Sequence, residues 1–375
     1  MVTIRRVAEG YAALLAGVLL GKLLALASEA VLGRNLGPAG LGSYGAAVAV
    51  MGYGLAVANL GLDVVGLRTA SLAPASAGRL AARIRACRLT MSLVVASLGI
   101  AGAVLGRVDL NLALPLCLVA IALAFRDDWL LMALGHERQV AVASVIRDAA
   151  FLSMVAFFLP RTHAVVAAAW SYLVAEIVWS LYIQVMVRLS LRRAATPVAQ
   201  MPLVRVWSDG LPIAVISILT LTTGRVGTAV VSWLGGPAEG GTYYAASRVL
   251  IACLALTAPI GRATLPQLAK GRNANGPAHG AAVLRLTAIT SMLGCVMALV
   301  LFHNPGAVMR FLYGPAFTAG ASVLRILAGC IFLTASYSIG LQQLLADGRQ
   351  GTLLWVTAAA AIANLSVALL LARRF

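Results

Sequence analysis

The sequence predicts an all-α polytopic membrane protein, made of two parallel six-helix repeats around a central cavity. Three observations predict this fold: 61% of the residues are hydrophobic and only 11% charged, apolar runs of about 20 residues recur along the chain, and one glycine-rich segment occurs twice. Soluble domains carry about 25% charged residues, and about 20 apolar residues form a helix that crosses a bilayer. We expect helices rather than a barrel, because no alternation with a period of two is present.

About eleven membrane-spanning helices are expected from the apolar runs. The longest connections, near residues 67–88, 188–208 and 266–282, are too short for a soluble domain. The expected spans are residues 9–32, 40–65, 89–106, 112–134, 140–160, 164–187, 210–233, 241–265, 283–303, 320–345 and 350–371.

The repeated segment indicates an internal duplication. GPAGLGSYGAA (Gly37 to Ala47) returns 199 residues later as GPAEGGTYYAA (Gly236 to Ala246), with Gly, Pro, Tyr and the final Ala-Ala in register. A weaker echo joins ALGHERQ, which begins at Ala133, to LLADGRQ. Chance recurrence in a Gly- and Ala-rich chain is the alternative interpretation.

The duplication divides the chain into an N-terminal lobe, residues 1–200, and a C-terminal lobe, residues 201–375. The first lobe holds spans one to six and the second holds spans seven to eleven, so the second repeat is expected to be incomplete and to lack a twelfth helix. Six spans per repeat is an even number. The repeats are therefore expected to be parallel, related by an axis along the membrane normal, with a substrate pathway between them.

The basic residues predict the orientation in the membrane. The net charge is +17, which in a soluble protein would suggest a nucleic-acid partner, but here most of the excess lies between apolar runs, so no nucleic-acid partner is expected. With a cytoplasmic N-terminus, fifteen basic residues fall inside and six outside. This bias follows the positive-inside rule and predicts a multi-pass membrane protein with a cytoplasmic N-terminus. The outside residues are Arg34, Arg107, Arg161, Arg310, Arg373 and Arg374.

Ionisable residues inside the spans are the candidate site residues, because such groups are costly in lipid and usually face a cavity or a partner. Cationic side chains could hold an anionic head group, since the planar guanidinium suits phosphate oxygens. Carboxylates could bind a coupling proton or cation. The cationic candidates are Lys22, Arg126, Arg147, Arg225, Arg248 and, more weakly, Arg34. The ion-coupling candidates are Asp127, Asp128, Asp148 and Glu176.

Internal pairing is the alternative for these charges. Arg126 could pair with Asp128 or Asp148, and Lys22 with Glu176, so that the charges only hold the bundle together. Eight or nine centred charges at roughly 2.5–3.5 kcal/mol each would be unusual for a passive bundle.

Catalytic and metal chemistry find no support in the sequence. The five cysteines are scattered, the four histidines are isolated, and no nucleophile–base arrangement lies on a connection. We therefore expect no enzyme activity, no cofactor and no metal.

Two segments resemble the polysaccharide-biosynthesis flippases, the Wzx-type O-antigen translocases. They are GRNLGPAGLGSYGAAVAVMGYGLAVANLGLD, from Gly33 to Asp63, and VMRFLYGPAFTAGASVLRILA, from Val308 to Ala328. The resemblance implies the multidrug/oligosaccharidyl-lipid/polysaccharide exporter fold. It further implies that an undecaprenyl-pyrophosphate-linked oligosaccharide is moved to the outer leaflet by alternating access. Expected partners are the lipid-linked oligosaccharide, membrane lipids and the polysaccharide polymerase machinery.

Three other functions remain open from the sequence. A cation-coupled multidrug antiporter of the same superfamily would favour a cavity dominated by carboxylates. A membrane polymerase or ligase would carry a large outer loop, and the outer loops here are short. An inactive truncated remnant would fit the missing twelfth helix, because relatives usually have twelve to fourteen.

Overall fold

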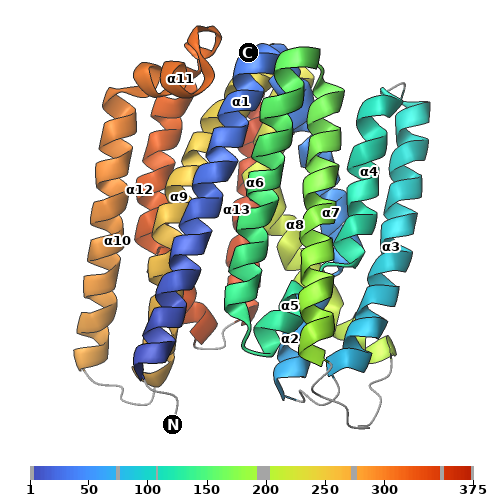
Figure 1. The fold of residues 1–375 in the computed structure, drawn as a ribbon. Coiled ribbons are helices and arrows are strands. Elements are labelled where there is room, and N and C mark those ends of the chain that lie inside the picture. Colours follow the sequence, from blue (N-terminus) through green and yellow to red (C-terminus); the bar gives the residue numbers. More distant parts are fainter. Residues whose placement is uncertain are drawn as a thin grey trace. The chain divides into compact units, whose positions relative to one another are not determined.

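The computed structural model describes residues 4–72, 77–106, 109–191, 203–271, 277–346 and 350–372, and these residues are almost entirely helical (Figure 1). No strand occurs among them. The elements are α1 (Ile4–Asn59), α2 (Leu62–Leu72), α3 (Ala77–Leu105), α4 (Leu110–Ala124), α5 (Asp128–Ala133), α6 (Glu137–Thr162), α7 (Val165–Leu191), α8 (Leu203–Leu234), α9 (Pro237–Gly271), α10 (Pro277–His303), α11 (Pro305–Tyr313), the 3-10 helix η3 (Pro315–Phe317), α12 (Gly320–Ala346) and α13 (Gln350–Ala372).

The helices confirm an all-α polytopic membrane protein, since each of the eleven predicted ranges is mainly helical. Among the described residues, seven helices are long and apolar enough to cross a membrane, or eight if the bent pair in α8 is counted as one span. The first of them, Leu19–Ser71, has 53 residues. It contains two predicted spans, because α1 consists of two helices that meet at Gly37 (φ 65°, ψ 179°).

Local sequence explains where several helices begin. Pro237, Pro277 and Pro305 each open a helix, a position where the missing N–H costs nothing and the fixed φ is helical. Asp109 precedes α4, and its side chain accepts a hydrogen bond from the backbone N–H of Asn111 at 2.9 Å. Hydroxyl groups within the helices bond to the carbonyl four residues earlier, as Ser28 does to Leu24 at 2.9 Å, which satisfies them without water.

Three features differ from the expectation. The segment predicted as a connection at 67–88 is helical, because α2 runs to Leu72 and α3 already begins at Ala77. The span predicted as continuous at 112–134 is broken between α4 and α5. The short helix α11, an amphipathic segment too short to cross a bilayer, was not predicted.

Some of the residues counted for the topology and the repeat lie outside the described part of the chain. They are Arg107, Arg192, Arg193, Arg272, Arg349, Arg373, Arg374 and part of the second echo, residues 347–349.

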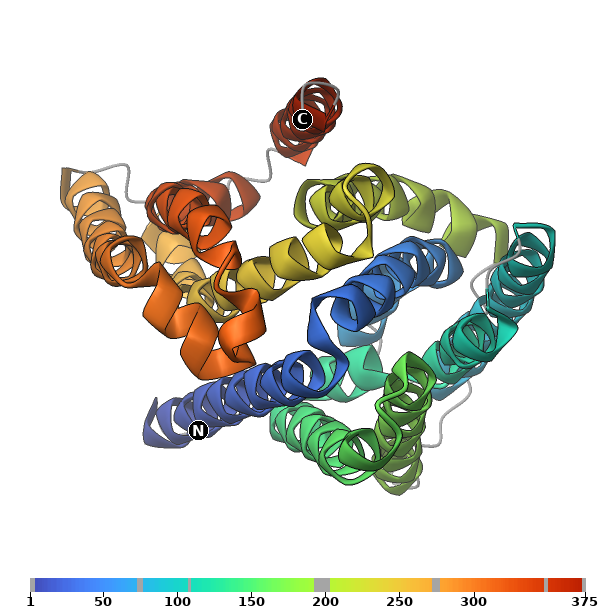
Figure 2. The ribbon, with the colours of Figure 1, turned by 90° about the horizontal axis from the view of Figure 1, so that it is seen from above.

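The chain forms two compact units. The first holds residues 1–28 and 43–229, and the second holds residues 29–42 and 230–375. In the first unit α3 packs beside α4, and both α4 and α6 pack on α7, as Figures 1 and 2 show. In the second unit α12 packs on α9 and α10, and α11 lies across the ends of α10 and α12 (Figure 1). The predicted lobes, 1–200 and 201–375, stay a prediction about the repeats; the compact units divide the chain elsewhere.

The two copies of the repeated segment pack against each other within the second unit. Gly37 and Gly236, which are equivalent in the repeat, both have positive φ, 65° and 86°. A Cβ atom on Gly42 would overlap the carbonyl oxygen of Pro237, and one on Gly241 would overlap the carbonyl oxygen of Pro38. The contacts are reciprocal between equivalent positions, which is the arrangement of a local two-fold axis. Glycine permits this close backbone approach, as it does where membrane helices cross.

Candidate functional site: a buried network of arginines and carboxylates

The break between α4 and α5 positions three consecutive ionisable residues, Arg126, Asp127 and Asp128. Successive residues on an α-helix point about 100° apart, so an unbroken helix would turn one of the three towards lipid. Instead α4 ends at Ala124, and the backbone N–H groups of Phe125 and Arg126 bond to the carbonyls of Ala122 and Leu123. This break allows the three side chains to find polar partners within the first unit.

Neighbouring helices satisfy the carbonyl groups that the break leaves open. Arg88 on α3 donates from Nη1 to the carbonyl oxygen of Arg126 at 2.8 Å. Gln184 on α7 donates from Nε2 to the carbonyl oxygen of Phe125 at 2.6 Å. The break is therefore built into the packing of α3, α4 and α7, because the carbonyls of Phe125 and Arg126 each have a side-chain donor from a neighbouring helix.

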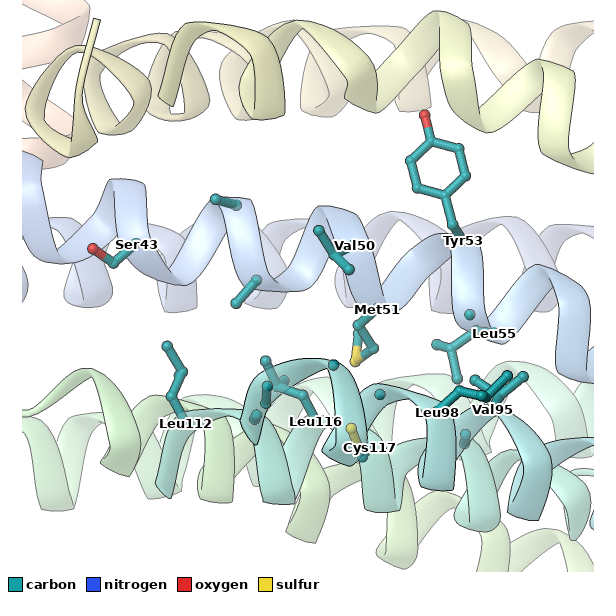
Figure 3. A pocket seen from close by; sticks show the side chains of 18 residues that line it. Ser43, Val50, Met51, Tyr53, Leu55, Val95, Leu98, Leu112, Leu116 and Cys117 are labelled. Carbon is teal, nitrogen blue, oxygen red and sulfur yellow. The ribbon is translucent and has the colours of Figure 1, made fainter. Parts of the chain in front are cut away.

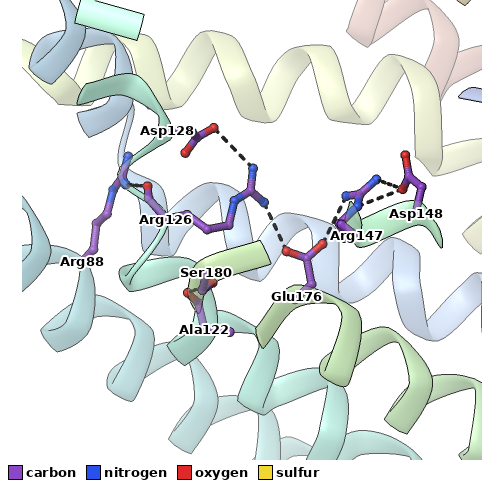
Figure 4. A network of polar contacts seen from close by, with 8 residues as sticks. All are labelled: Arg88, Ala122, Arg126, Asp128, Arg147, Asp148, Glu176 and Ser180. Atoms are coloured by element: carbon purple, nitrogen blue, oxygen red, sulfur yellow. Dashed lines mark hydrogen bonds and ion pairs between the residues drawn. The ribbon is translucent and has the colours of Figure 1, made fainter. Parts of the chain in front are cut away.

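Glu176 on α7 joins the break to α6. Its Oε2 accepts from Nη1 of Arg126 at 3.3 Å, and its Oε1 accepts from Nη1 of Arg147 at 3.2 Å (Figure 4). One carboxylate thus bridges two guanidinium groups with one oxygen for each. Both guanidinium groups also lie over the ring of Trp179, one turn further along α7, with Cζ 3.6 Å and 4.7 Å from the ring centroid. Cation–π attraction of this kind helps to hold the two arginines in place.

Each of the two arginines has a second carboxylate partner. Arg126 lies 3.6 Å from Asp128, measured from Nη2 to Oδ2. Arg147 donates from Nε and Nη2 to Oδ1 of Asp148 at 2.9 Å and 2.5 Å. The expected pairing of Arg126 with Asp128 is confirmed. Lys22 interacts electrostatically with Asp148, where the absence of a side chain at Gly21 lets α1 approach α6 closely.

Asp127 is the most buried carboxylate of the network, with an exposed fraction of 0%. Its Oδ2 accepts from Arg85 on α3, through Nε at 3.1 Å and through Nη2, and from Nε2 of Gln184 at 2.9 Å. The network of the first unit therefore contains four guanidinium groups and four carboxylates. They are Arg85, Arg88, Arg126, Arg147, Asp127, Asp128, Asp148 and Glu176.

The sequence analysis missed Arg85, Arg88, Trp179 and Gln184. The two arginines were assigned to a connection, although the buried residues Leu80, Ile84 and Cys87 recur nearby with helical spacing. That periodicity was the available signal. For Trp179 and Gln184 only their position three and eight residues after Glu176, on a similar side of the helix, pointed to the network.

The remaining cationic candidates have partners of other kinds. Arg225 on α8 donates from Nη1 to the carbonyl oxygen of Val48 at 3.1 Å, next to Gly52, within the first unit. Arg34 and Arg248 belong to the second unit. One cationic cavity that contains all six candidates stays a prediction, since Arg34 and Arg248 belong to the other compact unit.

In the second unit the two candidates have partners of different kinds. Arg248 lies 3.3 Å from Oε1 of Glu29 and donates to the hydroxyl of Tyr244 at 2.7 Å. Arg34 donates to the carbonyl oxygens of Phe311 and Leu312, the latter at 2.9 Å, at the end of α11. A cation at a helix C-terminus is favourable and replaces missing backbone partners. Arg34 therefore holds α11 in place.

An apolar groove of about 860 Å³ lies in the first unit between the second helix of α1, α3 and α4 (Figure 3). Small residues, among them Gly54, Gly99 and Gly102, make room for it. On α3 the lining residues Val95, Leu98 and Gly102 share a helical face with Arg88, which lies two turns before Val95. The face of α3 that lines the groove therefore also leads to the charged network.

Metal binding has no support within the described residues, where no group of three or more His, Cys, Asp and Glu side chains could hold an ion.

Comparisons with known proteins agree with this architecture. A family model described as "Polysaccharide biosynthesis protein" matches residues 7–272. No curated protein matches the chain. Among solved structures, the chain is similar to an inward-facing multidrug resistance MATE family transporter of the MOP superfamily, with a TM-score of 0.64 and 16% identity over 94% of this chain and 95% of that chain.

Two further solved structures have the same fold. An outward-facing MATE family transporter of the MOP superfamily has a TM-score of 0.60 and 18% identity over 98% of this chain and 95% of that chain. The MATE multidrug transporter DinF-BH, in complex with R6G, has a TM-score of 0.66 and 14% identity over 100% of this chain and 96% of that chain. At these identities the likeness establishes the fold alone.

Proposed function

Since the chain belongs to the polysaccharide biosynthesis family and has the fold of MATE transporters, we propose that it is a flippase for an undecaprenyl-pyrophosphate-linked oligosaccharide. In this proposal it moves the lipid-linked glycan across the cytoplasmic membrane by alternating access, for the synthesis of O-antigen, capsule or exopolysaccharide. Its N-terminus lies in the cytoplasm, as the distribution of basic residues indicates. The proposed activity is transport, with no catalytic step.

The observation that carries the proposal is the pair of guanidinium groups of Arg126 and Arg147, bridged by one carboxylate and stacked on one tryptophan. Two guanidinium groups side by side match the two phosphates of a pyrophosphate, because each planar fork can donate to two oxygens. Their side chains keep 20% and 23% exposure, so they are accessible, while Glu176 keeps 3%. An anion can therefore reach the arginines from the open side.

The decisive experiment is genetic. In cells that lack the gene, we expect lipid-linked glycan to accumulate on the cytoplasmic leaflet and surface polysaccharide to be lost. A copy with Arg147→Ala should fail to restore it, with transport reduced at least about 100-fold, because removing one partner of a buried charge-assisted contact costs about 3 kcal/mol. Arg161→Ala, which changes an exposed arginine at the end of α6, is the control and should restore it. Normal surface polysaccharide without the gene would exclude the proposal.

The apolar groove gives the proposed substrate's isoprenoid chain a place beside the charged network. Gly102 lies in it with open space around its Cα, so Gly102→Leu should fold normally and fill the groove. We expect transport to fall roughly tenfold, which corresponds to about 1.4 kcal/mol of lost binding. Gly329→Leu is the matched control, since this exposed glycine of α12 also has open space around it and belongs to the second unit, whereas the groove belongs to the first. Equal transport by both variants would remove the groove from the proposal.

A cation-coupled multidrug antiporter is the second candidate. The four carboxylates that balance the four arginines favour it, because such groups could bind a coupling ion. Drug accumulation in cells with and without the gene separates the two functions: the flippase leaves drug levels unchanged.

A further inference from the structure

We infer that Glu176 sets the anion specificity of this site: it occupies the position of the substrate's phosphates, so that a diphosphate displaces it and a single phosphate does so poorly. The inference rests on the proposed function and adds to it the residue that selects the head group. It follows from the hydrogen bonds that Arg126 and Arg147 both donate to Glu176.

Glu176 accepts one hydrogen bond from each arginine, and a diphosphate that bridges the two arginines could use the same pair of donors. Nη1 of Arg126 and Nη1 of Arg147 both donate to this carboxylate, at 3.3 Å and 3.2 Å. The other donors of Arg147, Nε and Nη2, are taken by Asp148. A diphosphate that bonds to both arginines through the N–H groups now directed at Glu176 must take the place of its two oxygens.

The exposure of the two arginines and their packing on Trp179 explain why a diphosphate can displace Glu176. Glu176 is 3% exposed, whereas the side chains of Arg126 and Arg147 are about one-fifth exposed, so an anion can approach the contact along the arginines. Trp179 supports both guanidinium planes independently of the carboxylate, at 3.6 Å and 4.7 Å (Figure 4 shows the two arginines on either side of Glu176). The arginines thus keep their spacing when the carboxylate turns away, which lowers the ordering cost of binding.

Charge explains why the exchange is selective. Two guanidinium groups with Glu176, Asp128 and Asp148 carry a formal charge of −1, and Lys22 beside Asp148 brings it to zero. A site without net positive charge attracts a weak anion poorly. A diphosphate has more charge and more oxygens than a monophosphate, and it can bond to both guanidinium groups at once. Competition with an internal carboxylate therefore favours the diphosphate.

The test measures binding of two probes with the same chain, farnesyl diphosphate and farnesyl phosphate, to the purified full chain in detergent. We expect the wild-type protein to prefer the diphosphate by about tenfold or more. Glu176→Gln should bind both probes more tightly, and the preference should shrink to about threefold or less. Glu176→Asp, whose shorter side chain cannot bridge both arginines, should fall between them. Glu137→Gln, an exposed glutamate at the start of α6, should bind like the wild type.

Two outcomes overturn the inference in distinguishable ways. If the wild type binds farnesyl diphosphate and Arg147→Ala abolishes this binding, but Glu176→Gln and Glu176→Asp both keep the wild-type preference, Glu176 has no role in selection and the proposed function stands. If the wild type binds neither probe, or if Arg147→Ala binds both as well as the wild type, the proposed phosphate site fails together with the inference. Size-exclusion chromatography of every variant shows that a change in binding does not come from unfolding.

Discussion

Gly42→Ala is expected to destabilise the protein by about 3 kcal/mol, near the upper end of the cost of overpacking. The added methyl group would overlap the carbonyl oxygen of Pro237, which is backbone and cannot rotate away. The two helices must therefore separate and lose their contact along the crossing. Gly241→Ala should have the same effect, because its methyl group would overlap the carbonyl oxygen of Pro38. Thermal unfolding in detergent, followed by tryptophan fluorescence, measures both losses.

The reciprocal contacts of Gly42 and Gly241 also predict the stability of the double variant. Once one alanine has separated the helices, the second alanine meets less resistance, so the double variant should lose clearly less than the sum of the single losses. Gly340→Ala is the control: this glycine lies within α12 with open space around it, and alanine there should be neutral or slightly stabilising. Additive losses at Gly42 and Gly241 would show that the two contacts are independent and would contradict a shared crossing.

Asp127→Ala is expected to cost about 3 kcal/mol, because removing one partner of a buried ion pair leaves polar groups without compensation. Asp127 is fully buried and accepts bonds from Arg85 and Gln184. Both donors would lose their acceptor, and Gln184 also holds the carbonyl of Phe125 at the helix break. Unfolding in detergent should therefore begin at a clearly lower temperature than in the wild type.

The neighbouring residue is the matched control. Asp128 is 21% exposed and has one ion pair at 3.6 Å, with Arg126, so Asp128→Ala should cost less than about 1 kcal/mol. Equal losses at the two positions would mean that the break between α4 and α5 does not depend on the buried contacts of Asp127.

Much of the fold could be predicted because a lipid bilayer restricts the secondary structure that an apolar segment can adopt. In a bilayer, an apolar run of sufficient length must be a helix, since its backbone groups have no other partners. The ranges of α6, α7 and α10 follow directly from this rule. It failed at the ends of helices: α3 begins at Ala77, before the predicted span, in a segment whose arginines interrupt the apolar run although its apolar residues are buried.

Several residues of the candidate site could be predicted from the sequence, but most of the contacts between them could not. Buried charges such as Arg126, Arg147 and Glu176 stand out in an apolar sequence, and they do lie together. Which charge meets which depends on contacts between residues up to 50 positions apart, such as Arg126 and Glu176. Only the position of Trp179, three residues after Glu176, pointed to it, because an aromatic residue in an apolar helix is otherwise like its neighbours.

The sequence by itself determined the fold class, and it predicted the apolar spans and the duplication, because hydropathy and repetition are local properties of the chain. The equivalence of Gly37 with Gly236 was also visible there, and both glycines have positive φ. Only the tertiary structure decided that the helix breaks at Arg126, that one carboxylate joins two arginines, and that Gly42 and Gly241 cross reciprocally. These features depend on which helix faces are brought together, and packing between distant segments alone settles that.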